Sequence, residues 1–217
     1  MARILYKEKV LSKNEELAAE VRERLATRGV FALNLISGPG AGKTSLVERT
    51  AAWAWGRVRT AALSGDQATE NDAVRIRSAG IPALQITTGS ECHLNAGRIL
   101  DLLDAPELAG IRLLLIENVG NLICPAAYDL GEAAKVAVLS VAEGDDKPLK
   151  YPALFQRAEL MVINKLDLLE LTNFQLDQAI ANARKVAPHL EVLCLSCRTG
   201  QGLEAWYQWI DDRLDRS

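Results

Sequence analysis

Residues 31–55 read FALNLISGPGAGKTSLVERTAAWAW and contain an apolar run, a glycine-rich loop and a helical pattern in direct succession. The loop, SGPGAGKTS (37–45), carries Gly-Lys-Thr near its end, at the position that a phosphate-binding P-loop requires. Ser37 departs from the consensus, which has glycine there. A glycine-rich turn that binds no nucleotide is the alternative, and the register of strand, loop and helix argues against it.

Each part of this loop has a predicted role in holding a nucleotide. Backbone amides turn inward around the phosphate oxygens, and the N-terminus of the following helix adds positive potential. We expect Lys43 to reach the β- and γ-phosphates and to support catalysis there, and Thr44 to bind Mg²⁺. The other predicted contacts of the loop are Gly38, Gly40, Ala41, Gly42 and Ser45.

The rest of the chain continues the alternation of short apolar runs and helix-length stretches. Several runs are apolar on both faces, which is typical of parallel strands that are covered on both sides. The predicted strands are 31–36, 58–63, 82–87, 111–116, 136–141, 160–164 and 191–196. We therefore predict a doubly wound α/β fold, with a mostly parallel sheet of about seven strands and helices on both faces.

The N-terminal segment predicts one more helix. SKNE (12–15) has the spacing of a capping box, and apolar residues then follow at four-residue intervals. This pattern predicts a helix over about 12–28. Because no repeat or linker interrupts the alternation, residues 1–217 are predicted to form a single P-loop domain.

The composition disfavours several classes of partner. The 217 residues are 49% hydrophobic and 24% charged, with a net charge of -3. Because this charge supplies no broad basic field, no nucleic-acid partner is expected. No apolar run reaches about 18 residues and no signal-peptide core is present, so neither a membrane partner nor export is expected. We predict a cytoplasmic protein whose cysteines serve metal binding or burial instead of disulfides.

Two later loops indicate which nucleotide binds. Asn164-Lys165-Leu166-Asp167 follows an apolar run with the N-K-x-D spacing of GTPase base-recognition loops. A carboxylate there accepts hydrogen bonds from guanine N1 and the 2-amino group, which adenine does not offer. Ser196 and Cys197, after the last predicted strand, resemble the final guanine-contacting loop of GTPases. GTP is therefore favoured over ATP, and a solvated turn is the alternative.

Two carboxylates are candidates for the Mg²⁺ shell or for orienting a catalytic water. Asp66 follows the second predicted strand and Glu117 follows the fourth, where a Walker-B-like acid lies in P-loop proteins. Either residue could instead cap a helix. Glu117 opens a D-x-x-G-like segment, and the amide of Gly120 is predicted to sense the γ-phosphate. Arg75 and Arg77 are candidate arginine fingers by their proximity to Asp66.

A third group of residues predicts a metal site. Cys92 and His93 follow the third predicted strand, and Cys124 follows the fourth, four residues beyond the switch glycine. A doubly wound sheet brings both loops to one edge, so the three side chains can converge near the nucleotide. Thiolate and imidazole suit Zn²⁺ in a tetrahedral site or Ni²⁺ in a square-planar one. The alternative is a buried Cys124 beside an unrelated Cys-His pair.

Taken together, these segments resemble the HypB-type GTPases, which support nickel insertion during the maturation of nickel-iron hydrogenase. The matching segments are SGPGAGKTSL, GDQATENDAVRI, TGSECHLNA, IENVGNLICPAAYDLGE, DDKPLKYP, NKLDLL and LSCRTGQGLEAW. The resemblance implies a homodimer around the nucleotide, with Cys92, His93 and Cys124 as a metal site at the subunit interface. It also implies that nickel is delivered, with hydrogenase maturation factors and the hydrogenase large subunit as partners.

Two features depart from the pattern of that family. Some members carry a cysteine motif or a histidine-rich stretch at the N-terminus, and MARILYKEKVLSKNEE (1–16) has neither. Nickel storage and high-affinity N-terminal binding are therefore not expected. The family often has glycine where this chain has Glu91, which is a candidate for an additional carboxylate ligand.

Three other functions compete with a nickel-delivering GTPase. A urease-type nickel GTPase would also bind GTP and metal, but its expected motif is Cys-Pro-His, whereas Cys-His and Cys-Pro stand apart in this chain. A non-catalytic, GTP-gated metal-binding scaffold would bind the same ligands without cleaving the γ-phosphate. A small-molecule kinase would transfer that phosphate, and no acceptor-substrate motif is evident.

Overall fold

The computed structural model describes residues 2–216, with side chains from residue 10 onward. All seven predicted strands are present and form one sheet. They are β1 (Phe31–Ser37), β2 (Thr60–Asp66), β3 (Ala83–Thr87), β4 (Leu113–Glu117), β5 (Ala134–Ser140), β6 (Leu160–Asn164) and β7 (Glu191–Cys194). Every pairing is parallel, in the order β3-β2-β4-β1-β5-β6-β7. The predicted doubly wound fold is confirmed.

Helical segments connect the strands, as the parallel pairing requires. They are α1 (Ala2–Thr27), α2 (Lys43–Ala54), α3 (Asn71–Ser78), α4 (Ala96–Leu100), α5 (Cys124–Ala127), α6 (Lys147–Lys150), α7 (Pro152–Arg157), α8 (Leu176–Val186) and α9 (Leu203–Leu214), with the 3₁₀ helices η1 (Pro106–Leu108) and η2 (Leu166–Leu171). Within the described residues, no helix has both the length and the apolar character needed to cross a bilayer.

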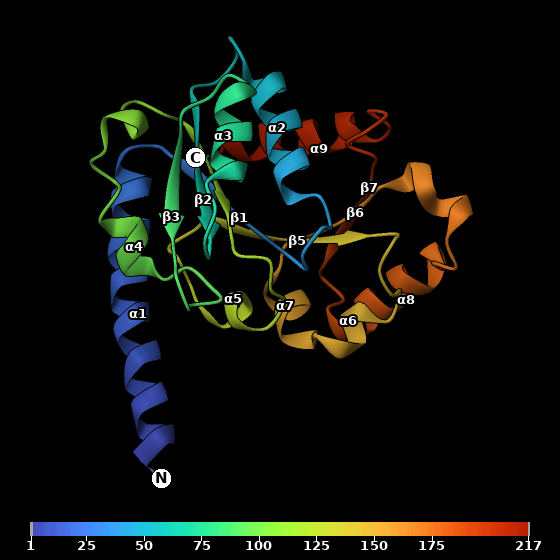
Figure 1. Cartoon of the computed structure of the whole chain (residues 1–217), viewed down its shortest axis with the longest axis horizontal. Helices are drawn as coiled ribbons and strands as arrows, with labels where there is room; N and C mark the ends of the chain where they lie inside the picture. The colour runs from blue at the N-terminus through green and yellow to red at the C-terminus, as the bar shows by residue number, and fades with distance from the viewer. Residues whose placement is uncertain (1, 217) are drawn as a thin grey trace.

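The helices lie in two layers, one on each face of the sheet (Figure 1). On one face, α2, α3 and α9 pack on the odd-numbered residues of β1, such as Leu33, and Trp206 is fully buried there. On the other face, α1 and α4 cover one half of the sheet, and α5, α7 and α8 cover the other. Each fully buried large apolar side chain stabilises this arrangement by about 1.5–3 kcal/mol.

Helix α1 starts at Ala2, earlier than the predicted start near residue 12. Its N-terminal half projects beyond the rest of the chain, whereas its C-terminal half lies beside α4 (Figure 1). Asn14 on this helix is buried and bonds two separate segments. Its Oδ1 accepts from the Ala96 N–H (2.9 Å), and its Nδ2 donates to the Asp129 carbonyl (2.8 Å). The helix therefore holds the segments after β3 and β4 together.

The topology determines which loops meet. Because all strands run in one direction, the segments that follow β1, β2, β3, β4, β6 and β7 all leave from the same edge of the sheet. β1 lies between β4 and β5, so the phosphate loop is at the centre of that edge. β2 lies between β3 and β4, so the two segments with the predicted metal ligands do not come from neighbouring strands.

Candidate functional site

The phosphate loop has the backbone that its glycines predict. Gly40 and Gly42 have φ values of 75° and 100°, in the left-handed region that favours glycine, and α2 begins at Lys43. Lys43 is 8% exposed, and its ammonium donates to Ser37 Oγ (2.9 Å). Serine at the first position of the loop thus has a physical role, because its hydroxyl accepts a hydrogen bond from the Lys43 ammonium.

Thr44 connects the phosphate loop to two acids. Its hydroxyl lies within hydrogen-bonding distance of Glu117 Oε1 (2.7 Å) and of Asp72 Oδ1 (3.0 Å). Glu117 is 3% exposed, and its second oxygen is buried with no hydrogen-bond partner. Burial raises the pKa of the Glu117 carboxyl to about 7, although the Lys43 ammonium and the Thr44 hydroxyl oppose this shift. A buried oxygen without a partner beside Thr44 fits a hard cation such as Mg²⁺.

The other predicted acid, Asp66, has a different environment. One carboxylate oxygen accepts from the Ala68 and Thr69 amides (2.9 and 2.8 Å), so Asp66 stabilises the turn after β2. It still lines the same cavity of about 610 Å³ as Lys43, Thr44 and Glu117. Asp66 therefore does not cap helix α3, whose N-cap position is Glu70, but bonds the turn before it.

Asp72 and Arg75 of α3 also line the cavity. The sequence indicated Arg75 and Arg77 as alternatives and did not indicate Asp72. Asp72 bonds Thr44, as described above, and no motif predicted that contact. Arg75 lines the cavity, where its guanidinium forms a two-pronged pair with Glu48 (2.9 and 2.8 Å). Arg77 donates to the Ala83 carbonyl (2.9 Å), which is a structural contact with β3. Of the two candidate arginines, the structure places only Arg75 at the cavity.

The N-K-x-D segment and the segment after β7 lie next to each other, as their predicted role in base recognition requires. Asn164 Oδ1 accepts from the Lys165 and Cys197 amides (2.7 and 3.1 Å), and Nδ2 donates to the Ala41 carbonyl (3.0 Å). Asp167 Oδ1 is 2.5 Å from the Ser196 hydroxyl, which donates to it. These contacts join both base-recognition segments to the phosphate loop.

A cavity of about 530 Å³ lies between these segments and α2. Lys165, with a φ of 65°, lies across the phosphate loop and donates from Nζ to the Gly40 carbonyl (2.7 Å). Arg49 on α2 donates to the Cys197 and Arg198 carbonyls (2.6 and 3.0 Å), a supporting contact that no motif predicted. This cavity shares Gly42, Ser45 and Lys165 with the cavity at the phosphate loop, so the two are adjacent.

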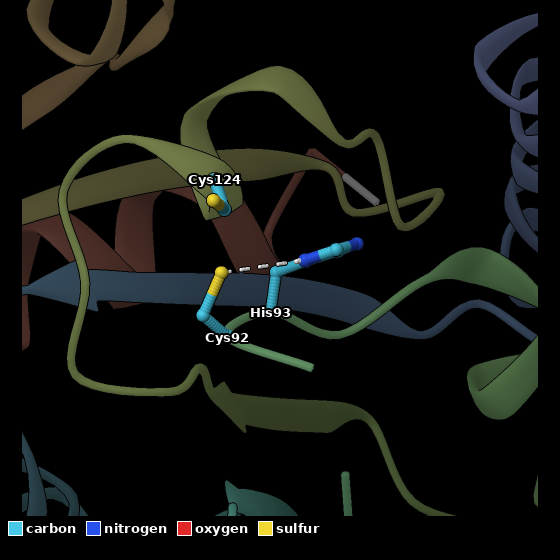
Figure 2. Close-up of side chains that lie close together, drawn as sticks. All are labelled: Cys92, His93 and Cys124. Atoms are coloured by element: carbon cyan, nitrogen blue, oxygen red, sulfur yellow. Dashed lines mark hydrogen bonds between the residues drawn. The ribbon is translucent and has the colours of Figure 1, made fainter. Parts of the chain in front are cut away.

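The three predicted metal ligands come together. One ligand atom each from Cys92, His93 and Cys124 lies within 4.8 Å of the others, and all three residues are partly buried. Figure 2 shows the Cys92 side chain pointing towards Cys124, with the His93 ring beside it; Cys92 Sγ is 4.0 Å from His93 Nδ1. None of the four cysteines is in a disulfide. Glu91 is not part of this cluster.

The imidazole has a neighbour that the sequence did not indicate. The ring of Tyr128 lies 3.8 Å from that of His93, centroid to centroid, at an interplanar angle of 31°. Burial lowers the pKa of His93, against the opposing effect of the Glu91 carboxylate. A neutral imidazole is the form that ligates metal, so this environment suits a ligand.

These features define the class of the protein: the chain is a P-loop GTPase. Residues 32–194 match the family described as CobW/HypB/UreG, nucleotide-binding domain. The chain is 53% identical over 205 residues to the hydrogenase maturation factor HypB of Azotobacter vinelandii, covering 93% of this chain and 67% of that one.

Two solved structures are also similar. The crystal structure of HypB from Archaeoglobus fulgidus gives a TM-score of 0.88 at 40% identity, over 94% of this chain and 100% of that chain. The crystal structure of HypB from Helicobacter pylori in complex with nickel gives a TM-score of 0.88 at 39% identity, over 94% and 96%. The chain belongs to the CobW/HypB/UreG family, and the predicted resemblance is confirmed.

Proposed function

We propose that this protein is a GTP-hydrolysing metallochaperone that binds nickel or zinc and assists nickel insertion into nickel-iron hydrogenase. The observation that carries the proposal is the meeting of two thiols and an imidazole within 4.8 Å, on segments that leave the same sheet edge as the phosphate loop. Sulfur and imidazole nitrogen are ligands that nickel and zinc accept, and magnesium prefers oxygen. Several similar proteins are named hydrogenase maturation factors, and two from Helicobacter pylori are named hydrogenase/urease maturation factors.

The nucleotide site has residues that could hold the phosphates, the base and Mg²⁺. Lys43 and the loop amides would hold the phosphates, and Asn164 and Asp167 would select guanine. Thr44 and Glu117 would hold Mg²⁺, because Glu117 has a buried oxygen without a hydrogen-bond partner, and Asp66 and Asp72 line the same cavity. When bound, this ion neutralises charge that develops on the phosphates.

A homodimer would complete the metal site. Three ligands leave coordination unfinished, and Ile123, directly before Cys124, is 66% exposed. An apolar side chain beside a half-exposed ligand fits an interface with a second copy. Hydrogenase maturation factors and the hydrogenase large subunit are the proposed recipients. We place the protein in the cytoplasm, because thiols such as Cys92 and Cys124 stay reduced there.

The test measures metal stoichiometry and subunit mass on one sample, with GDP and then with a non-hydrolysable GTP analogue. We expect nickel binding that is lost in Cys124→Ser and that changes with the nucleotide. Cys194→Ser is the matched control, because Cys194 lies on β7 outside the cluster. Metal binding that is equal in all three proteins would contradict the proposal.

A second measurement separates the enzyme from a GTP-gated scaffold. Single-turnover assays with metal present should convert GTP to GDP and phosphate, slowly if no further residue orients the water. Intact GTP after prolonged incubation would favour the scaffold, and transfer of the γ-phosphate to a molecule other than water would favour a kinase.

A further inference from the structure

A buried amide connects the nucleotide site to the metal cluster. Asn118 is 1% exposed and directly follows Glu117 at the end of β4. Its Oδ1 accepts two hydrogen bonds, from the Val119 amide (3.0 Å) and from the Leu94 amide (3.2 Å). Val119 belongs to the predicted switch segment, residues 117–120, and Leu94 is the residue directly after His93. A single oxygen atom is therefore shared by the two functional segments.

The nucleotide end of this connection touches the phosphate loop. A Cβ atom built on Gly120 would lie 3.3 Å from Pro39 Cα, so the switch backbone is in close contact with the loop that holds the phosphates. The backbone amide of Asn118 donates to the Leu35 carbonyl (3.1 Å), which fixes its main chain to β1. Because the Asn118 backbone is held, its side chain is the part of Asn118 that is free to follow Val119.

The metal end of the connection is equally confined. The side chain of Leu94 is fully buried, and it lies so close to Gly65 of β2 that a Cβ there would come within 2.9 Å of it. Leu94 is therefore held by its amide on one side and by its side chain on the other. Since Leu94 is bonded directly to His93, a shift of its amide moves the imidazole.

The nitrogen of the Asn118 side chain is connected, through Asn34 and Glu132, to the segment that follows Cys124. Asn118 Nδ2 donates to Asn34 Oδ1 (3.2 Å), and Asn34 Nδ2 donates to Glu132 Oε1 (3.0 Å). Glu132 Oε2 accepts from the amide of Leu130 (2.7 Å), two residues beyond the Tyr128 that contacts His93. Asn34 is fully buried and Glu132 is 7% exposed, so water does not replace these bonds.

We propose that Asn118 is a positioning residue that couples the nucleotide state to the geometry of the metal cluster; this rests on the proposed function. If the γ-phosphate draws the Gly120 amide towards it, the Val119 amide turns with it. The Asn118 oxygen then has to follow Val119 or stay with Leu94, because losing either bond leaves a buried amide unpaired. If the oxygen follows Val119, the Leu94 amide has to follow it or lose its bond, which changes the position of His93 relative to Cys124 and so the affinity for the metal.

The experiment compares nickel dissociation constants with GDP and with a non-hydrolysable GTP analogue. Asn118→Ala is the test variant, and Asn95→Ala is its matched control. Asn95 lies in the same metal segment, but its side chain accepts from the Arg98 amide of α4 (3.1 Å). We expect the ratio of the two constants to fall at least about fivefold, towards one, in Asn118→Ala and to persist in Asn95→Ala. An unchanged ratio in Asn118→Ala would overturn the coupling role.

A measurement on the wild type covers the case in which Asn118→Ala does not fold. In ¹⁵N-labelled protein without metal, exchanging GDP for the GTP analogue should shift the amide resonances of Val119 and Leu94 together. A Val119 resonance that shifts while that of Leu94 stays in place would rule out the coupling. This readout needs no nickel, so it stands if the nickel proposal fails, and wild-type protein that binds no nickel would refute only the proposed function.

Discussion

The predicted guanine pocket, which is the cavity between the N-K-x-D segment, the segment after β7 and α2, lies at the same sheet edge as the metal cluster. The hydrogen bonds that hold the two sites differ. In the guanine pocket, Asn164 bonds three backbone groups and Asp167 bonds Ser196, so the binding residues fix one another. In the metal cluster, the contacts described are made by neighbouring groups: the Tyr128 ring contacts His93, and the amide of Leu94, the next residue, bonds Asn118. Binding residues that bond one another keep one shape. Metal ligands that depend on contacts of neighbouring residues can move when those neighbours move.

The largest effect should come from Gly42→Ala, which disturbs the guanine pocket beside Asn164. A Cβ on Gly42 would overlap the Asn164 amide at a φ of 100°. Backbone strain of about 1–2 kcal/mol and disrupted Asn164 bonds of about 1–3 kcal/mol should make Gly42→Ala bind GTP roughly 100-fold more weakly, while nickel binding without nucleotide persists. Calorimetric titration of each ligand checks this.

The control for that variant is Gly40→Ala. Gly40 has a φ of 75° in the same loop, but a Cβ there would meet nothing within 4 Å. Strain alone should weaken GTP binding about tenfold, from a cost of about 1–2 kcal/mol. If the two variants lost equal affinity, contact between the loop and Asn164 would not contribute to the rigidity of the pocket.

Asp167→Asn tests whether the rigid pocket selects the base. Replacing the carboxylate by an amide removes an acceptor for guanine N1 and the 2-amino group, so the preference for GTP over ATP should fall by about 1–3 kcal/mol, roughly 5- to 160-fold. Competition binding with both nucleotides measures it. Nickel affinity should be unchanged, and an undiminished preference for GTP would remove Asp167 from the base site.

Tyr128→Ala tests whether the ring of Tyr128 stabilises His93 in the metal cluster. The ring contact with His93 at 3.8 Å should contribute about 0.5–1.5 kcal/mol, so nickel affinity should fall by up to about tenfold. Tyr128→Phe keeps the ring and should keep the affinity, as measured by competition with a chelator. Equal losses in both variants would mean that the hydroxyl, and not the ring, supports the imidazole.

The smallest effect should come from Ser196→Ala. This change removes the hydroxyl that donates to Asp167, at a cost of about 1 kcal/mol, or about fivefold in GTP affinity. Thr199→Ala is its control, because the Thr199 hydroxyl accepts only a long contact from the Gln201 amide (3.4 Å). GTP affinity as high in Ser196→Ala as in the control would show that Asp167 holds its position without Ser196.

The strands and the nucleotide motifs were predictable from the sequence, whereas the contacts that hold the site residues in place were not. Apolar runs on both faces predicted all seven strands, and the spacing of Gly-Lys-Thr and N-K-x-D located both cavities. The convergence of Cys92, His93 and Cys124 followed from the shared sheet edge. β2, however, separates β3 from β4, an order that periodicity does not encode.

The missed contacts share a physical reason. Asp72 reaches Thr44 because of how α3 lies against α2, and Tyr128 reaches His93 because of the path of the segment after β4. Both depend on the relative placement of elements distant in sequence, which no local spacing specifies. The hydrogen bond from Leu94 to Asn118 belongs to the same group, since asparagine near a strand end usually signals a turn.

The contacts of Asn14 give helix α1 a use in protein engineering. A chain shortened beyond Asn14 would keep every strand and the phosphate loop, but Ala96 and Asp129 would lose the side chain that bridges them. Fluorescent labels or affinity handles therefore belong on the projecting half of the helix, before Asn14. Placed there, they leave both hydrogen bonds of Asn14 to the metal segments in place.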